Sequence, residues 1–591
     1  MRVTERVEEE VVTTNLFGGR LVRMALLTVG GILAGCVQLL LAQEVPAPTI
    51  RVTTHMVLVD VVVTDKQGKP VTGLRAEDFA LEEKGKEQKI ASFTASAGAA
   101  PAPEPLPPGI YTNRAQYRSP GGPITVLLLD ALNTAFKDQA YARLQMLKFV
   151  QQQYRPGERM AVLTLTGSLR VLQDFTSDPQ ILQSALQRYR PVPQEFASTA
   201  RATTGDGGPM SASAAAASLD PAALPNNSVS ADAGLRSGAA ASLSSAQAAV
   251  AAFAGADVAY GQDQRVQLTL TALKSIARIL GGLPGRKSVI WVTGAFPFTL
   301  IPEDRSVTEA ELEESLPSLD TRRVDEHASG NYAATFRAAH AEDIRETSAR
   351  LTAAQVAIYP VDARGLSIST DSDSIETMRE MARETGGRAY VNQNEIRDGV
   401  AQAFSDQAAV YTLGYYPENK KYDGQYRPIK VKLNHPGVEI FHRRGYYAID
   451  PTQLKDYNPN QEVAAALGDA LPSTLVAFRV QVKSAEDNAV KGKVGVTFLV
   501  DADTLSAEDA SGGKHMNVVF YATSYSRDGK MLANHSQKVD QVFNADTYRQ
   551  VLQRGMMLHM DLDPVPGADQ IRLAVQDGRT GMVGTIDAPA P

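Results

Sequence analysis

Buried strands and amphipathic helices alternate through the middle of the chain. Continuous apolar runs predict strands that are buried on both faces at Ile124–Asp130, Met160–Thr166, Ser288–Gly294 and Val356–Asp362. Segments with apolar residues at helical spacing separate these runs, and this alternation predicts a parallel sheet covered by helices on both faces. Ligand sites in such sheets lie at the carboxyl ends of the strands, so the residues that follow each run are the first candidates for function.

Strands with alternating apolar and polar residues flank this α/β region. Ile50–Phe93 has the β-branched alternation and the turns of a small β-module, which we place at residues 50–95. An Ala/Pro-rich linker follows at residues 96–120. Near the other end, alternating strands separated by Gly, Asp and Pro predict a C-terminal antiparallel β-sandwich at residues 460–591.

The predicted α/β domain spans residues 121–450, and two insertions interrupt it. Residues 196–256 are rich in Ala, Ser and Gly, and they have too few large side chains to offset the loss of chain entropy, so we expect a disordered insertion. Residues 303–329 form a second, more acidic insertion. The length of 591 residues suggests about four domains. The insertions and the leader reduce this expectation to three folded domains.

Charge and cysteine content narrow the class of protein. The chain has 59 Lys and Arg against 66 Asp and Glu, and its formal net charge of −7 gives no electrostatic case for binding nucleic acid. A single cysteine excludes a disulfide scaffold, an iron–sulfur site and a cysteine-based zinc site. The hydrophobic fraction of 43% is that of a globular protein and excludes a polytopic membrane protein.

Residues 1–45 have the features of an export signal or membrane anchor. Met24–Ala42 contains no charged residue, and as a helix it would reach about 28 Å, close to the thickness of the bilayer core. Arg20 and Arg23 precede it, which predicts that the N-terminus stays inside and the rest is exported to the periplasm, the outer membrane or the exterior. A cleaved signal peptide, a lipoprotein with its lipid on Cys36 of an LAGC lipobox, and an uncleaved anchor all stay open.

Several motifs occur in a specific order between Ile50 and Asp450. They are VDVVVTDKQGKPVTGLRAEDFALEE, LLLDALNT, GRKSVIWVTGAFPF, TGGRAYVNQNEI and AVYTLGYYPENKKYDGQYRPIKVKLNHPGVEIFHRRGYYA. Together they resemble the acidobacterial von Willebrand factor A-related family. The resemblance implies a Rossmann-like α/β fold, the von Willebrand factor A-type domain, with a metal-ion-dependent adhesion site at the top of the sheet.

In A-type domains that site is an Asp-x-Ser-x-Ser loop after the first strand, a Thr on a later loop and an Asp after a middle strand. Such oxygen ligands suit Mg²⁺ or Mn²⁺, and an open position accepts a carboxylate from the partner. Here the resemblance matches Asp130 to the first Asp and Thr134 to the second hydroxyl, with Asn133 beside it, whereas Leu132 replaces the first Ser. The candidate metal ligands are therefore Asp130, Asn133 and Thr134.

The implied metal site is degenerate. No Asp follows the strand that ends at Thr293, and the Thr loop falls in or near the Ala/Ser-rich insertion, where Thr203 and Thr204 are two of several candidates. One carboxylate balances a divalent charge poorly, unless Asp362 reaches over from a neighbouring strand. The alternative is that Asp130 is a structural residue whose oxygens accept N–H bonds from the following turn.

Aromatic residues gather near the end of the resembling region. Exposed Tyr and Arg are good interface anchors, but the strand-like alternation of this segment favours packing inside the protein. The cluster comprises Tyr411, Tyr415, Tyr416, Tyr422, Tyr426, Tyr446 and Tyr447, around Arg443 and Arg444.

We expect a binding protein and not an enzyme, because the sequence contains neither a Gly-x-Ser-x-Gly elbow nor a His-Glu-x-x-His motif. The expected function is adhesion in the cell envelope, with a protein or polysaccharide partner held at the top of the sheet. Thr293, Gly294, Phe296 and Phe298 would form the partner-binding face. A metal-independent envelope scaffold is the alternative, an unrecognised hydrolase is a weaker one, and contact with the membrane would come from the N-terminal segment.

Overall fold

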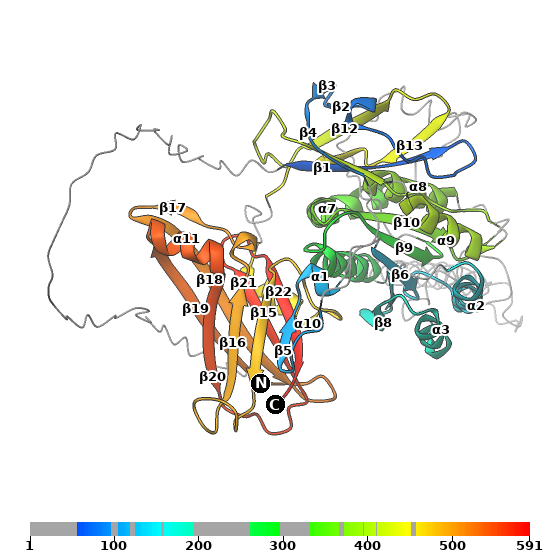
Figure 1. The fold of residues 1–591 in the computed structure, drawn as a ribbon. Helices are drawn as coiled ribbons and strands as arrows, with labels where there is room; N and C mark the ends of the chain where they lie inside the picture. The colour runs from blue at the N-terminus through cyan, green and yellow to red at the C-terminus, as the bar shows by residue number, and fades with distance from the viewer. Residues whose placement is uncertain are drawn as a thin grey trace, which may run out of the picture.

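A computed structural model describes residues 56–95, 104–118, 124–154, 159–193, 261, 263–295, 330–365, 372–393, 395–408, 410–450 and 457–591. These residues form a central α/β unit and two β-sandwiches (Figure 1). The N-terminal segment with Cys36 and both predicted insertions lie outside the described residues. No helix within the described ranges is long and apolar enough to cross a membrane.

The central sheet has five strands, and the predicted mixed α/β class is confirmed. In spatial order the strands are β10 (Val356–Asp362), β9 (Lys287–Thr293), β6 (Ile124–Asp130), β7 (Arg159–Leu165) and β8 (Leu169–Thr176). Neighbouring strands are parallel from β10 to β7, and β8 returns antiparallel to β7. The four predicted strands agree within one residue. The fifth, β8, was not predicted because its side chains are mostly half-buried and form no continuous apolar run.

Helices cover both faces of this sheet, so each face packs in its own apolar core. One core involves α2 (Phe136–Gln152), α3 (Pro179–Arg188) and α9 (Ile396–Ser405). The opposite core involves a helix at 263–280, α7 (Gly330–Ala353) and α8 (Ser372–Thr385). Asp178 begins α3 as predicted, because its carboxylate accepts the Gln180 backbone N–H at 2.8 Å.

The first sandwich stacks two four-stranded sheets over one core. One sheet contains β13 (Val438–His442), β1 (Val57–Asp65), β11 (Val410–Tyr415) and β4 (Ile90–Ala95). The other contains β14 (Gly445–Tyr447), β12 (Tyr426–Leu433), β2 (Phe79–Glu83) and β3 (Lys86–Gln88). Its core contains much of the predicted aromatic cluster: Tyr411, Tyr415 and Tyr446 are buried, whereas Tyr416 and Tyr422 are exposed.

This sandwich corrects the predicted boundaries at residues 95 and 450. The expected small module is only half of a domain, because β1 pairs with β11 and β13, and β2 pairs with β12. Those partner strands follow the α/β unit in the chain. The sequence analysis had included them in the α/β domain at residues 121–450. The pattern of each strand was visible in the sequence, but the identity of its neighbour is a tertiary property.

The second sandwich also receives a strand from a distant segment. Its sheets are β20 (Met556–Leu562), β16 (Val494–Val500), β15 (Phe478–Lys483) and β5 (Ile110–Thr112), stacked on β17 (Glu508–Ala510), β18 (Gly513–Tyr525), β19 (Met531–Phe543), β21 (Gln570–Asp577) and β22 (Val583–Pro589). β5 lies in the predicted linker and pairs with β15. The linker assignment at 96–120 is therefore corrected. A short helix, α1 (Ala115–Arg118), leads from β5 toward the central sheet, and α11 (Ala545–Arg554) joins β19 to β20.

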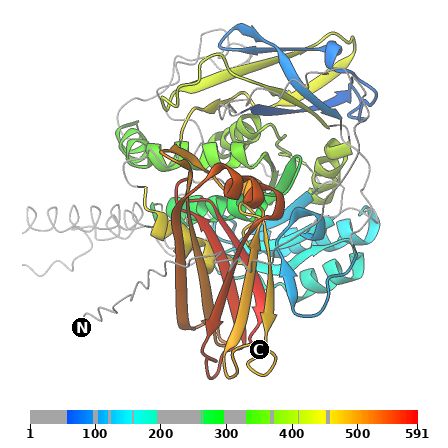
Figure 2. The same ribbon diagram turned by 60° about the vertical axis from the view of Figure 1, so that its left-hand side comes forward.

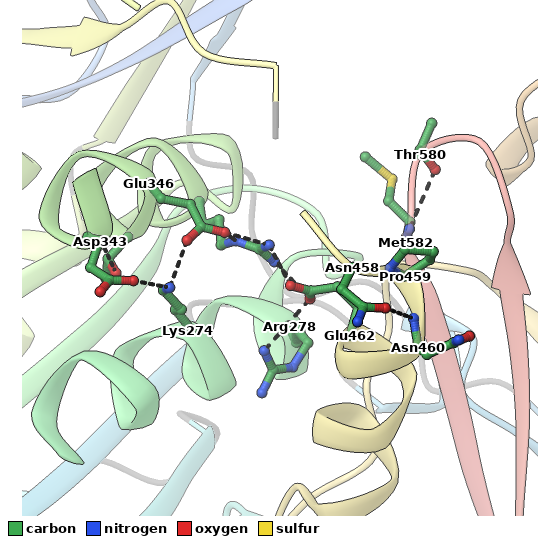
Figure 3. Close-up of polar contacts among 12 residues, drawn as sticks. Lys274, Arg278, Asp343, Glu346, Asn458, Pro459, Asn460, Glu462, Thr580 and Met582 are labelled. Carbon is green, nitrogen blue, oxygen red and sulfur yellow. Dashed lines mark hydrogen bonds and ion pairs between the residues drawn. The ribbon is translucent and has the colours of Figure 1, made fainter. Parts of the chain in front are cut away.

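Charged side chains join the second sandwich to the α/β unit (Figure 3). Helix α10 (Pro459–Gly468) precedes the sandwich, and its Glu462 accepts two bonds from Arg350 of α7, at 2.7 and 3.0 Å. The buried Arg278 binds Asp469 in the same bidentate way, at 2.8 and 2.9 Å. Gly282 allows the backbones to meet closely, because a Cβ there would lie 1.7 Å from the Thr474 carbonyl oxygen. Figure 2 shows both sandwiches against the same α/β unit.

Asn113 holds β5, the strand from a distant segment of the chain, to the second sandwich. Its side chain is 1% exposed, donates to the carbonyls of Ser473 and Val476, and accepts the N–H of Phe478 at 2.9 Å. We expect Asn113→Ala to lower the free energy of unfolding by about 2–3 kcal/mol, because buried backbone groups lose their partners. Urea denaturation measures this, and the exposed Asn460→Ala should stay within about 0.5 kcal/mol of wild type. Equal effects of both substitutions would contradict this role.

The buried Lys287 should make the free energy of unfolding depend on pH. The side chain is 1% exposed at the start of β9, and burial lowers its pKa to about 8, against an ordinary value of 10.5. Between these values the unfolded chain binds more protons than the folded chain, so the free energy of unfolding should rise with pH, by roughly 1–3 kcal/mol from this group. Denaturation across this window should show the rise in wild type and in exposed Lys420→Met, and its loss in Lys287→Met. A rise that persists in Lys287→Met would assign it to another group.

Candidate functional site

The carboxyl ends of β6 and β9 form the topological switch point of the central sheet. The next two strands of the chain, β7 and β8, lie on one side of β6, and the later strands β9 and β10 lie on the other. Connections that leave in opposite directions open a crevice at this point, which is where open α/β sheets bind ligands. Asp130 ends β6 and Thr293 ends β9, so the tertiary structure brings these predicted residues to the same position.

Asp130 is enclosed by hydrogen-bond donors. Its Oδ1 accepts the Asn133 backbone N–H at 2.9 Å. Its Oδ2 accepts the Asn133 side-chain amide at 3.0 Å, the Trp291 indole N–H at 3.0 Å and the Thr293 hydroxyl at 2.8 Å. The carboxylate is only 2% exposed. Each donor comes from the loop after β6 or from β9, so the network closes the crevice of the switch point from within.

The loop after β6 is held from two further directions. The Thr134 hydroxyl accepts the Gly294 backbone N–H at 2.9 Å, which ties this loop to the end of β9. Gln139 of α2 donates to the Thr134 carbonyl at 2.8 Å and accepts from the Tyr189 hydroxyl at 3.2 Å. A cavity of about 10 Å³ beside Asp130 is at the lower limit for one water molecule. It is far smaller than the hundreds of Å³ that a small-molecule substrate needs.

The buried environment changes the acid–base properties of these groups. Burial raises the pKa of Asp130 above its ordinary value of 3.8, and the bonds from Asn133, Thr293 and Trp291 oppose this effect. Burial, together with the charge of Asp130, raises the pKa of Tyr189 to about 12. A carboxylate with four protein donors and a protonated phenol form a buried network that stabilises this end of the sheet.

These residues do not fit a divalent cation. Mg²⁺ and Mn²⁺ require oxygen ligands with free lone pairs, whereas Asp130 Oδ2 already accepts three donors and Oδ1 accepts a fourth. Asp362 does not supply the second carboxylate, because both of its oxygens bind the Arg364 guanidinium, at 2.9 and 3.0 Å. Within the part of the chain that the structure describes, no three His, Cys, Asp or Glu residues are grouped to hold a metal. The geometry favours the structural alternative for Asp130.

The predicted partner-binding face needs correction. The side chain of Thr293 is completely buried and Gly294 is buried beside it, so neither offers a surface to a partner. Both belong to the network around Asp130. Phe296 and Phe298, like the candidate metal residues Thr203 and Thr204, lie outside the described residues.

The sequence reasoning missed Trp291 as part of the site. Trp291 is the only tryptophan of the chain, and it lies two positions before Thr293 on β9. Residues two apart on a strand point to the same face, so Trp291 and Thr293 both reach Asp130 on the neighbouring strand. This spacing was a readable signal, although the pairing of β9 with β6 was needed to give it meaning.

Three large apolar side chains are exposed on α2 and α3, and the first of them lies next to the closed network. Phe136, the first residue of α2, is 54% exposed, and Leu144 on the same helix is 51% exposed. Ile181 of α3 is also exposed, and Arg143 ties the two helices together by donating to the Leu186 carbonyl at 2.9 Å. We call Phe136, Leu144 and Ile181 the α2 surface. In both ribbon views α2 and α3 lie on the side of the α/β unit away from the sandwiches (Figures 1 and 2).

The sequence matches no family model, and it is not detectably similar to any curated protein.

Substitution of Asp130 tests its structural role. We expect Asp130→Ala to lower the free energy of unfolding by about 3–5 kcal/mol, because it strands buried donors, including the Trp291 indole. Asp138→Ala, at a half-buried position on α2, should cost less than about 1 kcal/mol. Millimolar Mg²⁺ or Mn²⁺ should leave the melting temperature of wild type and both variants unchanged. A metal-induced rise in wild type that Asp130→Ala abolishes would establish the cation site instead.

Proposed function

We propose that this chain is an exported binding protein of the cell envelope, and that it holds a protein or polysaccharide partner on a von Willebrand factor A-type domain without a metal ion. The export part of the proposal comes from the uncharged Met24–Ala42 run and the arginines before it. The A-type assignment comes from the sequence motifs around Asp130 and Thr293. A helix-covered, largely parallel sheet with Asp130 at the end of its first strand supports it.

The observation that carries the binding part is the exposed α2 surface. Large apolar side chains on one helix cost free energy in water, and clusters of them mark interaction sites. Phe136 is an aromatic residue with more than half of its surface exposed, which is the kind of anchor that dominates binding energy when a partner buries it. Its position immediately after the loop of Asp130–Thr134 places the proposed surface at the carboxyl-end edge of the sheet.

The same neighbourhood supports metal independence. The α2 surface needs no charged ligand, and the carboxylate next to it already has four protein donors. The closed network instead holds the N-terminal end of α2 in place, because Gln139 in the first turn of the helix donates to the Thr134 carbonyl. A rigid, preformed apolar face loses little conformational entropy when it binds.

Capture from envelope extract tests the proposal. We expect immobilised Ile50–Pro591 to retain a specific partner equally well with Mg²⁺ and with a chelator. The double substitution Phe136→Ser/Leu144→Ser should weaken retention by about tenfold or more, since loss of a buried anchor costs over 1.4 kcal/mol. Affinity of the identified partner is then measured for the purified pair by biolayer interferometry.

A matched control uses apolar residues that are exposed elsewhere. Leu552→Ser/Met557→Ser removes two such residues from the second sandwich, 49% and 67% exposed, and should bind as wild type does. Release of the partner by the chelator would instead support metal-dependent adhesion. Equal binding by both double variants would exclude the α2 surface, and no specific partner in any condition would remove the main support for adhesion.

A further inference from the structure

A small cavity lies where the first sandwich meets the α/β unit. Its volume is about 20 Å³, room for one water-sized or chloride-sized group. Leu58 and Asp60 of β1 and Arg443 of the sandwich line one side, and Arg286 and Gln355 are among the residues that line the other. The cavity is remote from the switch point, because Arg286 and Gln355 precede β9 and β10, at the amino ends of the strands.

Two arginines face this cavity with unused donors. Arg443 is 7% exposed, and its Nη2 donates to the Leu58 carbonyl. Arg286 donates from Nη2 to the Tyr359 hydroxyl at 3.0 Å and to the Gly386 carbonyl. The Nε of each arginine is buried, and among the described residues neither has a hydrogen-bond partner. A buried N–H of a charged group without an acceptor is costly, and two of them belong to residues that line this one cavity.

The charges around this cavity indicate which class of hydrogen-bond acceptor it would bind. Arg286, Lys287 and Arg443 all interact with the charge of Asp60, which is the carboxylate of the cavity. Among the described residues Asp60 forms no ion pair within 4 Å, and its oxygens accept the Thr412 hydroxyl at 2.6 Å and the Gln355 amide at 3.3 Å. Asp406 is a second carboxylate that interacts with Arg286, and it pairs with Arg388 at 3.9 Å. Four cations against two carboxylates leave positive charge in a region of low dielectric, where a single negative charge is strongly favoured.

We propose that this cavity binds one small monovalent inorganic anion of the halide class, held by the guanidinium N–H groups of Arg286 and Arg443. Its size excludes phosphate, sulfate and carboxylate metabolites. The anion bridges β1 and Arg443 of the sandwich to the α/β unit, so its binding stabilises the contact between the two. This role is independent of partner binding at the α2 surface.

Halide substitution in the full chain tests the proposal. Crystals soaked in bromide should show an anomalous peak between the two guanidinium groups. At constant ionic strength, replacing gluconate by chloride should raise the melting temperature saturably, by about 3 °C or more. Arg443→Lys keeps the charge but removes the Nε donor, and it should abolish the chloride response. Arg444→Lys, at the neighbouring position, should retain it.

Two results on the wild-type protein, and one on a variant, would overturn the proposal. One is the absence of an anomalous peak in the cavity of the wild-type protein, which needs no variant and is therefore independent of folding defects. The other is an identical melting temperature of wild type in chloride and gluconate, which would assign the cavity to water. A chloride response that survives in Arg443→Lys would place the anion elsewhere on the protein.

Discussion

Strands that precede the α/β unit in the chain pair with strands that follow it, and these pairs hold the protein together. The Thr112 hydroxyl bonds to the Phe478 carbonyl across 366 positions, and the Leu74 N–H bonds to the Tyr411 hydroxyl across 337. Each sandwich is therefore complete only when the chain has passed through the central sheet and returned. Closing such long loops costs entropy, which the burial of two apolar sandwich cores must offset. The three units consequently form one interdependent structure, and none has a continuous sequence boundary.

Buried and half-buried charges then fix how the units are oriented. Arg278 with Asp469 and Arg350 with Glu462 are bidentate pairs, and their geometry tolerates little rotation of the second sandwich against the α/β unit. Such pairs add little net stability, because desolvation offsets most of their attraction. Their contribution is specificity of placement. Where the first sandwich meets the α/β unit, the cations around the cavity of Arg286 and Arg443 outnumber the carboxylates, which supports the proposed binding of an anion there.

The closed switch point supports the proposed binding of a partner without a bound ion. In this chain Trp291 and Thr293 supply donors to the carboxylate that, in the resembling family, would meet a cation. The crevice is therefore filled by protein groups. The hydrogen bond from Gln139 to the Thr134 carbonyl connects these groups to α2. The proposed partner surface therefore lies outside the crevice, from the exposed start of that helix onward. The same loop after β6 thus has a supporting role in place of a ligating one.

The sequence by itself determined the local structures: the apolar runs of Ile124–Asp130 and Val356–Asp362 coincide with β6 and β10, and Asp178 begins α3. These depend on side-chain period and on caps, which act over a few residues. Only the tertiary structure decided which strands pair, that β5 belongs to the second sandwich, and that Asp130 meets donors from β9. The physical reason is that strand partners and buried hydrogen bonds join residues hundreds of positions apart, and no local pattern records which distant segment completes them.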